Sequence, residues 1–380
     1  MGSEMCIRDS LVNNFISLNK KTVDEQYPMN DPNELLSRVA GGKYLTRVDL
    51  RKAFFQVNLS KRSQKYTAFH TPFGVFSYRR MAMGLKCASF TAQRLLDRIL
   101  RGTHRFTGTL IDDILVFSKD FDLHLTQVRE VLDRLRQAGL TANTEKCTFA
   151  SNDIVIFGHR VHDGTIQPDN EKIEVIANWP TPRNKKQLRS FLGLSNYFKS
   201  YIPRYSSLAF PLTEMLRKAK PDKLQWDDEK QRSFDGLKNA LISRPVLRPP
   251  DMTKEYILMT DCSQTAIGCI LMQPGDSENS PHHVTAYASR KLLPRERKFA
   301  TVELELMAIA YGLTKFNQFV YNRQVSVYSD HKPLQWLNSL SKHSARLARL
   351  NLIIQNHNVK TLTWIKGQDQ LADALTRLPV

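Results

Sequence analysis

The chain has 380 residues, too many for one ordinary hydrophobic core, so we expect two or three domains. Hydrophobic residues make up 41% and charged residues 24%, a globular composition that excludes a wholly disordered chain. No apolar run approaches the roughly 18 residues that a membrane-spanning helix needs, so we expect no membrane partner.

The net charge of +18 at pH 7 indicates a polyanionic partner, for which nucleic acid is the leading candidate. The alternative is a basic surface that only keeps the protein soluble. The cysteines form neither a CxxC pair nor a zinc spacing with histidine, and we interpret them as free thiols in a reducing compartment. They are Cys6, Cys87, Cys147, Cys262 and Cys269.

Residues 1–10, MGSEMCIRDS, contain neither an apolar core nor an Arg/Ser-rich amphipathic pattern that would indicate targeting. We interpret them as a non-native leader. We expect the sequence that belongs to the protein to start near Leu11, in the middle of a domain.

Between Leu11 and Val161, strand-like and helix-like patterns are mixed. YLTRVDL and FFQVNL are apolar, β-prone runs on either side of a charged break. ASFTAQRLLDRILRG and FDLHLTQVREVLDRLRQAGL predict amphipathic helices that end at Gly102 and Gly139. TLIDDILVFS predicts a hairpin interrupted by two adjacent aspartates.

Residues 162–250 predict helices with prolines at their joints, followed by a proline-rich linker, SRPVLRPPD. From residue 251 to 380 four predicted strands, EYILMT, HVTAYAS, VSVYS and VKTLTWI, combine with helices, chiefly ELELMAIAYGLTKF. Helices and strands in this arrangement predict an α+β architecture.

Three aspartates interrupt β-prone segments in the N-terminal half. Asp49 follows YLTRV, and Asp112 and Asp113 stand between TLI and ILVF. Carboxylates are rare in strands unless they pair or bind metal. Two-metal nucleotidyl transfer needs such hard oxygen ligands. Adjacent residues of an extended segment point to opposite faces, so we expect only one of the pair to be a strong ligand. The alternative is an ordinary β-turn, in which Asp-Asp is common.

The runs KYLTRVDLRKAFFQVNLS, TAFHTPFGVFSYRRMAMGLKCAS, LIDDILVFSKD and NWPTPRNKKQLRSFLGLSNYFKSYIP resemble the reverse transcriptases of gypsy-type LTR retrotransposons. The motifs keep the family's order and spacing from about Leu18 to Pro379. The resemblance implies a right-hand polymerase palm with partial fingers, a helical thumb and connection, and a C-terminal ribonuclease H-like domain.

We accordingly assign residues 11–161 to partial fingers and palm, 162–250 to thumb, connection and linker, and 251–380 to the ribonuclease H domain. The family's fingers strand with basic residues for the triphosphate belongs upstream of Leu11, which leaves the polymerase activity of this piece of chain open.

By this resemblance Asp49, Asp112 and Asp113 are the metal-binding triad of the palm, with Asp49 and Asp112 the principal ligands. Phe54 takes the place of the aromatic residue beneath the incoming sugar, which excludes a 2′-hydroxyl; the alternative is core packing. The other substrate-binding positions that the resemblance implies are Met83 and Gly84, and Phe157, Gly158 and His159 at the primer end.

Some positions depart from the family pattern. Leu110 stands where the family has an aromatic residue. Ala82-Met83-Gly84-Leu85 replaces Pro-Phe-Gly-Leu, and the next four residues stand where Asn-Ala-Pro is common. These exchanges are among apolar or small residues and remove no carboxylate.

A second acidic set lies in the C-terminal third. Two aspartates end predicted strands, two glutamates lie in the helix TVELELMAIAYGL, and one aspartate begins LADALTR; in chain order they are Asp261, Glu303, Glu305, Asp330 and Asp373. Acidic residues at the ends of adjacent strands, joined by one from a helix, are typical of the ribonuclease H fold. The alternatives are a dipole-favoured residue in a first helical turn for Asp373 and a turn cap for Asp330.

The resemblance makes Asp261, Glu305, Asp330 and Asp373 the catalytic and metal-binding set, because Glu305 fits the family's Glu-x-x-Ala-Ile pattern better than Glu303. It implies two Mg²⁺ ions per active site, with Mn²⁺ as a substitute. The expected partners are an RNA template, a DNA primer, an RNA–DNA hybrid, dNTPs and other Pol or Gag products of the element.

The function implied is that of an RNA-directed DNA polymerase with ribonuclease H activity, located in cytoplasmic virus-like particles or in the nucleus. Two alternatives stay open. One is a decayed copy that binds nucleic acid without polymerising, and the other is a pararetrovirus polymerase of the same chemistry.

Overall fold

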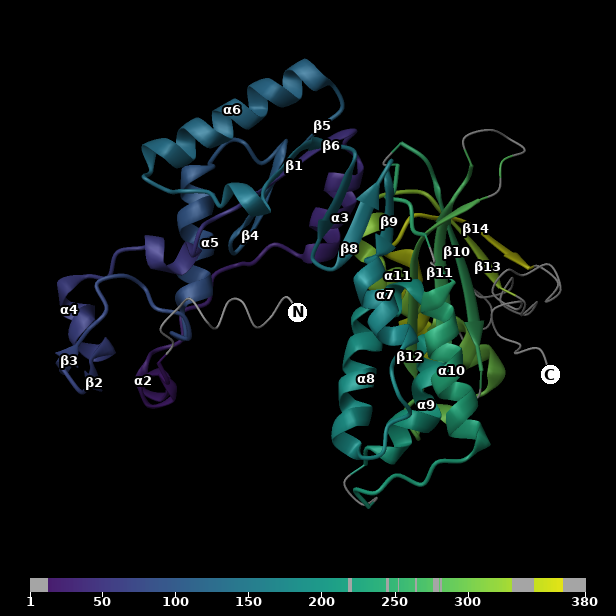
Figure 1. The fold of residues 1–380 in the computed structure, drawn as a ribbon. Helices are drawn as coiled ribbons and strands as arrows, with labels where there is room; N and C mark the ends of the chain where they lie inside the picture. Colours follow the sequence, from purple (N-terminus) through teal and green to yellow (C-terminus); the bar gives the residue numbers. More distant parts are fainter. Residues whose placement is uncertain are drawn as a thin grey trace. The chain divides into compact units, whose positions relative to one another are not determined.

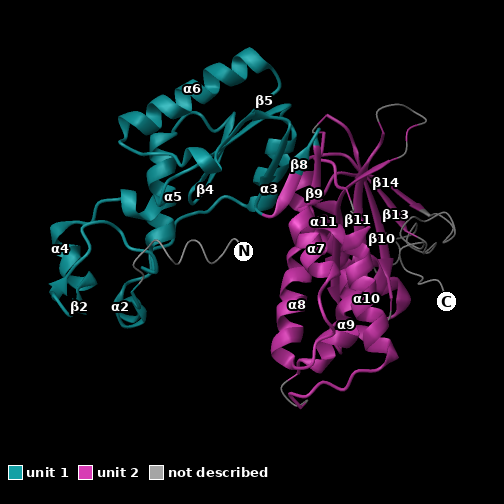
Figure 2. Ribbon diagram, in the orientation of Figure 1, with its two compact units in different colours: residues 1–157, 161–164 teal, residues 158–160, 165–380 magenta. Residues whose placement is uncertain are grey.

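The computed structural model describes residues 13–217, 221–243, 246–251, 253–263, 265–275, 280, 282–329 and 345–364. The chain divides into two compact units, which Figures 1 and 2 show as ribbons. Unit 1 comprises residues 1–157 and 161–164, and unit 2 comprises residues 158–160 and 165–380. Within the described residues, no helix combines the length and apolar character needed to cross a membrane.

A four-stranded antiparallel sheet forms the centre of unit 1, in the order β4-β5-β1-β6. Its strands are β1 (Tyr44–Asp49), β4 (Thr107–Leu110), β5 (Asp113–Ser118) and β6 (Thr148–Ser151). Val48, Ile114 and Val116 are buried on one face, beneath helices α5 (Ala88–Ile99) and α6 (Phe121–Gln137). The predicted hairpin and both predicted helices are therefore confirmed.

Local signals explain where α6 begins and ends. The carboxylate of Asp120 accepts a hydrogen bond from the Leu123 amide at 2.9 Å, which caps the first turn. Gly139 follows the helix with φ +70°, a conformation that glycine adopts without strain.

The run FFQVNL does not form the strand that its composition favours. Residues Ala53–Gln56 form the 3₁₀ helix η1, entered through Lys52 with φ 48°. The ring of Phe54 packs against the buried side chains of Met81, Ala88 and Ala92. Tertiary packing of this aromatic residue and the turn at Lys52 therefore override the local β propensity.

Short elements complete unit 1. They are α2 (Ile16–Lys21), α3 (Pro32–Ala40), α4 (Lys61–Gln64), η2 (Lys65–Thr67), β2 (Phe69–Thr71), β3 (Gly74–Phe76), η3 (Thr144–Lys146) and β7 (Asp153–Ile156).

Unit 2 contains a five-stranded mixed sheet in the order β12-β11-β10-β13-β14. Its strands are β10 (Tyr256–Cys262), β11 (Ala266–Gln273), β12 (His283–Lys291), β13 (Val325–Ser329) and β14 (Val359–Trp364). The pairs β10–β11 and β11–β12 are antiparallel, whereas β10–β13 and β13–β14 are parallel. Helix α11 (Thr301–Lys315) and helix α14 (Ala345–Gln355) bury apolar side chains against this sheet.

Strand β11 was missing from the sequence prediction, which counted four strands where the sheet has five. Its sequence AIGCILMQ has no polar alternation, because both faces are buried and all but Gly268 of its residues are inaccessible. A continuous apolar run of this kind does not reveal a strand by its periodicity.

A helical layer precedes this sheet in the chain. It contains α7 (Asn170–Ala177), α8 (Lys185–Tyr197), α9 (Tyr205–Met215) and α10 (Asp228–Ile242), together with the short elements β9 (Thr165–Pro168) and η4 (Lys199–Tyr201). Two further short elements, η5 (Glu296–Lys298) and α12 (Asn317–Val320), lie between β12 and β13 in the chain. β8 (His159–His162) spans the boundary between the units.

Helix α9 is docked on strand β12. The Ser206 amide donates to Ser289 Oγ at 3.0 Å, and Lys291 Nζ lies 4.1 Å from the ring centroid of Phe210. Lys291 also forms an ion pair with Glu214. The described end of the predicted linker is likewise fixed, because Leu247 and Ile166 exchange backbone hydrogen bonds and the Arg248 amide donates to Val284.

This docking predicts that the helices and the sheet of unit 2 unfold together. Leu258 in β10 is buried against α11, so Leu258→Ala should lower the free energy of unfolding by about 2–5 kcal/mol. The fluorescence of Trp179 and Trp226, which lie in the helical layer, should report the same shift in urea midpoint as hydrogen exchange in β10. The exposed Leu352 provides the control, and Leu352→Ala should change stability by less than about 0.5 kcal/mol. Separate midpoints would show that the two layers are independent.

Candidate active sites

The first acidic set lies where β1 meets the β4–β5 hairpin. Asp49, near the end of β1, is paired in register with Asp113, the first residue of β5. We expected Asp112 to lie in an extended segment. Instead, Ile111 and Asp112 form the turn between Leu110 and Asp113. The turn interpretation is thus correct for the position of Asp112, and this turn also places Asp112 beside the other two carboxylates.

The turn is held in an unusual backbone conformation. Ile111 has φ 58°, which is costly for a β-branched residue. The Ile111 amide donates to the side-chain oxygen of Gln93 at 2.9 Å, and the buried Gln93 amide donates in turn to Thr109 Oγ1 at 2.9 Å. Helix α5 therefore fixes the turn through one buried glutamine.

One arginine balances part of the negative charge. Arg47 Nε donates to Asp113 Oδ1 at 2.8 Å, and Arg47 Nη2 lies 4.0 Å from Asp49 Oδ2. Arg47 precedes Asp49 by two residues in β1, so both side chains point to the same face of the strand. The role of Arg47 was not predicted from the sequence, although its two-residue spacing from Asp49 was a signal for it.

Burial and mutual repulsion act against ionisation of two of these aspartates. Burial raises the pKa of Asp49, with the charge of Asp113 adding to the effect and Lys146 and Arg47 opposing it. Burial likewise raises the pKa of Asp112, and the charges of Asp113 and Asp49 raise it further. The carboxylates therefore act as one electrostatic site, in which a bound cation would relieve repulsion.

The donor chemistry of this site fits a hard divalent cation, since three carboxylates share it. In the portion of the chain that the structure describes, however, no three His, Cys, Asp or Glu side chains are already gathered closely enough to hold an ion. Binding would require the carboxylates to converge, and Asp113 to be shared with Arg47. The assignment of Asp49, Asp112 and Asp113 as metal ligands stays a prediction.

The substrate-binding positions are dispersed in the fold. Phe54 is half-buried against the α5 cluster, and Met83 is exposed. Gly84 has φ +89°, and its carbonyl accepts a hydrogen bond from Asn19 at 2.8 Å. The roles of Phe54, Met83 and Gly84 stay predictions.

Of the predicted primer-end residues, Phe157 and Gly158 form a tight turn, and the imidazole ring of His159 is packed among aromatic side chains. Phe157 and Gly158 both have positive φ, 50° and 72°. His159 is buried in unit 2, where its ring centroid lies 5.4–5.5 Å from three aromatic rings, those of Tyr197, Phe198 and Tyr201. The packing gives His159 a structural role, and the primer-end assignment stays a prediction.

The second acidic set lies in unit 2. Asp261 is in β10 opposite Gly268 of β11, and Glu305 is in the second turn of α11, only 5% exposed. Both carboxylates lie near the thiol of Cys262. Burial raises the pKa of that thiol to about 12, and the charges of Glu305 and Asp261 contribute to the increase. The structure thus brings Asp261 and Glu305 to one end of the sheet. Asp330 and Asp373 lie outside the described residues.

Glu303 has other contacts. Its carboxylate lies 3.0 Å from Arg346 of α14 and accepts a hydrogen bond from the Ala300 amide at the start of α11. These contacts stabilise the helix end, which favours Glu305 over Glu303 as the functional acid.

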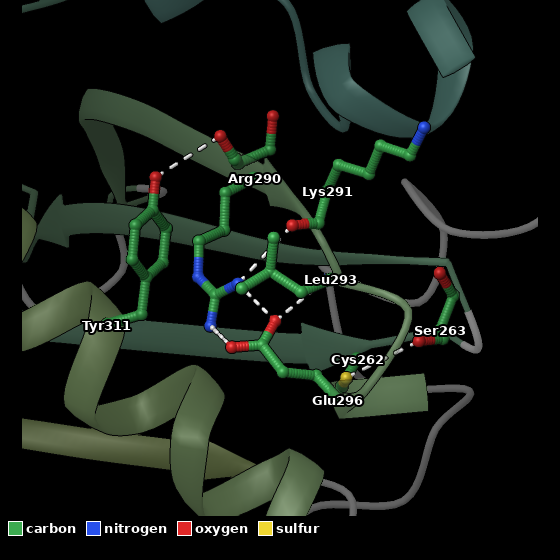
Figure 3. Close-up of polar contacts among 8 residues, drawn as sticks. Cys262, Ser263, Arg290, Lys291, Leu293, Glu296 and Tyr311 are labelled. Carbon is green, nitrogen blue, oxygen red and sulfur yellow. Dashed lines mark hydrogen bonds and ion pairs between the residues drawn. The ribbon is translucent and has the colours of Figure 1, made fainter. Parts of the chain in front are cut away.

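A bidentate ion pair adjoins this region, as Figure 3 shows. Arg290 Nη1 and Nη2 donate to the two carboxylate oxygens of Glu296 at 2.7 and 3.2 Å, and Glu296 also accepts from the Leu293 amide at 2.8 Å. The guanidinium lies 5.5 Å from the ring centroid of Tyr311 in α11. This pair was not predicted from the sequence. It fixes the loop between β12 and α11 and hence the start of the helix that carries Glu305.

Comparisons with known proteins match one family in each part of the chain that carries an acidic set. Residues 5–195 match the family described as reverse transcriptase (RNA-dependent DNA polymerase), and residues 226–327 match the RNase H-like domain found in reverse transcriptase. The chain is 34% identical over 375 residues to the retrovirus-related Pol polyprotein from transposon 297 of Drosophila melanogaster, covering 97% of this chain and 34% of the relative. It is 30% identical over 379 residues to that from transposon gypsy of the same organism, covering 97% and 36%.

Solved structures show the same fold. The foamy viral protease-reverse transcriptase dRH in complex with ds DNA has a TM-score of 0.82 at 21% identity, covering 97% of this chain and 63% of that one. The foamy viral protease-reverse transcriptase in complex with RNA/DNA hybrid has a TM-score of 0.75 at 22% identity, covering 97% and 49%. The predicted α+β fold class is confirmed.

This chain spans about a third of the length of the curated relatives that it matches. Reverse transcriptase and RNase H domains carry nucleotidyltransferase and hydrolase chemistry, and they generally depend on divalent metals. On the family match, the shared fold and the Pol relatives of gypsy-type and related LTR transposons, the chain belongs to the reverse transcriptase family and carries an RNase H-like domain.

Proposed function

We propose that the chain is an RNA-directed DNA polymerase with ribonuclease H activity, acting as part of a retrotransposon Pol polyprotein. The observation that carries the proposal is the cross-strand pair Asp49–Asp113, with Asp112 beside it, inside the region that matches the reverse transcriptase family. The raised pKa values of Asp49 and Asp112 support this proposal, because a bound cation would stabilise the ionised carboxylates.

In the polymerase site Asp49 and Asp112 would be the principal ligands of two Mg²⁺ ions, for which Mn²⁺ could substitute, and Asp113 would assist. When bound, such ions supply Lewis-acid stabilisation of the attacking and leaving oxygens in nucleotidyl transfer. The chain's own residues keep the site assembled: Arg47 restrains Asp113, and Gln93 restrains the turn that carries Asp112.

In the RNase H-like site Asp261 and Glu305 would hold the metal, together with Asp330 and Asp373, for hydrolysis of the RNA strand of a hybrid. The Arg290–Glu296 ion pair holds the loop that leads from β12 into α11, the helix that carries Glu305. The expected partners are an RNA template, a DNA primer, dNTPs and an RNA–DNA hybrid. The similar foamy viral protease-reverse transcriptases are in complex with ds DNA and with RNA/DNA hybrid, which supports nucleic-acid partners for this chain. Other Pol and Gag products, and location in a virus-like particle, complete the proposal.

The two-site proposal predicts a clean separation of activities. Asp112→Asn preserves volume but removes one charge from the polymerase site, so dNTP incorporation should fall by orders of magnitude while cleavage of a preformed hybrid stays near wild type. Asp261→Asn should do the reverse. Each tenfold loss corresponds to about 1.4 kcal/mol of transition-state stabilisation.

Template-primed incorporation and hybrid cleavage should be measured with each divalent ion, on this chain and on a longer form that extends upstream. Each variant is the control for the other, because distant sites act independently. A folded variant that loses both activities would contradict two autonomous sites. Activities that survive both substitutions would contradict the assignment of Asp112 and Asp261, whereas a folded wild-type chain that binds the substrates without incorporating dNTPs would favour the decayed copy.

The position of Phe54 predicts a role in sugar selection. Phe54→Val should shorten the side chain beneath the sugar and raise ribonucleotide incorporation relative to dNTPs by at least about tenfold. Competition between rNTPs and dNTPs measures this ratio. The neighbouring half-buried Phe55 provides a matched control, and Phe55→Val should leave the ratio unchanged. If both variants kept the wild-type ratio, Phe54 would be a packing residue only.

A further inference from the structure

A long stretch of unit 1 contains basic residues and no acidic residue. Residues 50–96 contain no Asp or Glu, although the whole chain has 37. The same stretch contains nine cationic residues, which are Arg51, Lys52, Lys61, Arg62, Lys65, Arg79, Arg80, Lys86 and Arg94. Such a segment attracts a polyanion along its whole surface.

The β2–β3 hairpin lies within this stretch and presents aromatic side chains to solvent. Phe73, at its tip, is 91% exposed, Phe76 is 50% exposed, and Tyr66 in the preceding η2 is 61% exposed. Large aromatic side chains at such exposure are costly in water and mark an interaction surface. Figure 1 places β2 and β3 together with α4 at one extremity of unit 1.

The hairpin is a built element rather than a loose loop. Its register is Phe69↔Phe76, His70↔Val75 and Thr71↔Gly74. The tip is closed by Thr71 Oγ1, which donates to the Gly74 carbonyl at 2.9 Å and accepts from the Phe73 amide at 3.2 Å.

An aromatic column anchors the hairpin to the rest of unit 1. Ring centroids are 6.3 Å apart for Phe76 and Phe69, 5.4 Å for Phe69 and Tyr78, and 6.3 Å for Tyr78 and Phe55. Phe69 and Tyr78 are half-buried in this column. The column therefore anchors the hairpin while Phe73 at its tip stays exposed to solvent.

Cations surround the exposed rings and are available to a ligand. Lys61, Arg62, Lys65 and Arg79 are exposed, and none of them forms an ion pair with a carboxylate within the described residues. Lys65 Nζ lies 5.1 Å from the ring centroid of Tyr66. Positive charge without acidic neighbours is complementary to an anionic partner, and the phosphates of nucleic acid are one such partner.

We propose that the β2–β3 hairpin and α4 form a stacking platform for unpaired nucleic acid, in which Phe73 and Tyr66 stack on bases while Lys61, Arg62 and Lys65 bind phosphates. Exposed aromatics among cations bind single strands because each unpaired base offers a free π-face, whereas the bases of a duplex are already stacked. The identity of the strand, unpaired template ahead of the primer, rests on the proposed polymerase function.

The test compares two substrates in EDTA, so that no chemistry occurs. One is a DNA primer on an RNA template with an unpaired 5′ template overhang, and the other is the same duplex with blunt ends. Fluorescence anisotropy should show that the wild-type chain prefers the overhang, and Phe73→Ala should reduce this preference by about tenfold. Phe73→Trp should retain it. The replacement K61Q/R62Q should lower the slope of log affinity against log salt by about one.

A matched control is Tyr321→Ala in unit 2, because Tyr321 is 65% exposed, close to the 61% of Tyr66. It should leave the overhang preference unchanged. Equal preferences in wild type and Phe73→Ala would overturn the proposal. So would a fall in sedimentation mass on Phe73→Ala without any change in overhang binding, because a second copy of the chain would then be the partner.

Addition of Mg²⁺ and dNTPs to the same samples separates this proposal from the proposed function. A wild-type chain that prefers the overhang through Phe73 but incorporates no dNTP would support the platform and contradict the polymerase function. A chain that incorporates dNTPs without any overhang preference would overturn the platform alone.

Discussion

The cross-strand pairing of Asp49 with Asp113 is the constraint on which the polymerase site depends. Like charges directly opposite each other destabilise a sheet, so this register needs a cause elsewhere. The cause is the apolar face of the same strands, since Val48 pairs with Ile114 and both are buried beneath α5 and α6. A slip of one residue would turn the carboxylates into that core. Hydrophobic burial thus imposes an electrostatically costly arrangement that Arg47 offsets.

Backbone strain at Ile111 lies next to the repulsion between Asp49 and Asp113. Ile111 has positive φ, and strained residues of this kind cluster at functional sites. Its amide is bound by Gln93, whose side chain also donates to Asp97, and Asp97 accepts from Tyr27. This partly buried network links the turn to α5 and to the segment before α3. The position of Asp112 is therefore determined by residues that carry no charge in the site.

Sequence patterns predicted the helices α6 and α11 and the strands β1, β5 and β10. Helix α6 has one buried face, whereas β10 is buried along most of its length and was predicted from its apolar, β-prone run. Strand β11 is also buried on both faces and shows no polar alternation, and η1 forms because Phe54 packs on α5. The acidic residues were recognisable because carboxylates in apolar runs are costly. Their partners were harder to find: Gln93 and Glu296 act through contacts between separate segments, which local pattern does not encode.

The two acidic sites differ in how their charge is balanced, and this difference bears on how each would accept a cation. In unit 1 the guanidinium of Arg47 is bonded to a carboxylate of the site itself, so an ion bridging all three aspartates must compete with it for Asp113. Asp49, 4.0 Å from the same guanidinium, is engaged more weakly. This asymmetry favours Asp49 and Asp112 as the principal ligands. In unit 2 the guanidinium of Arg290 is instead taken up by both oxygens of Glu296. That ion pair holds the loop that precedes α11, so in unit 2 the bidentate arginine acts on the position of the helix that carries Glu305, whereas in unit 1 the arginine acts on an acidic residue of the site itself.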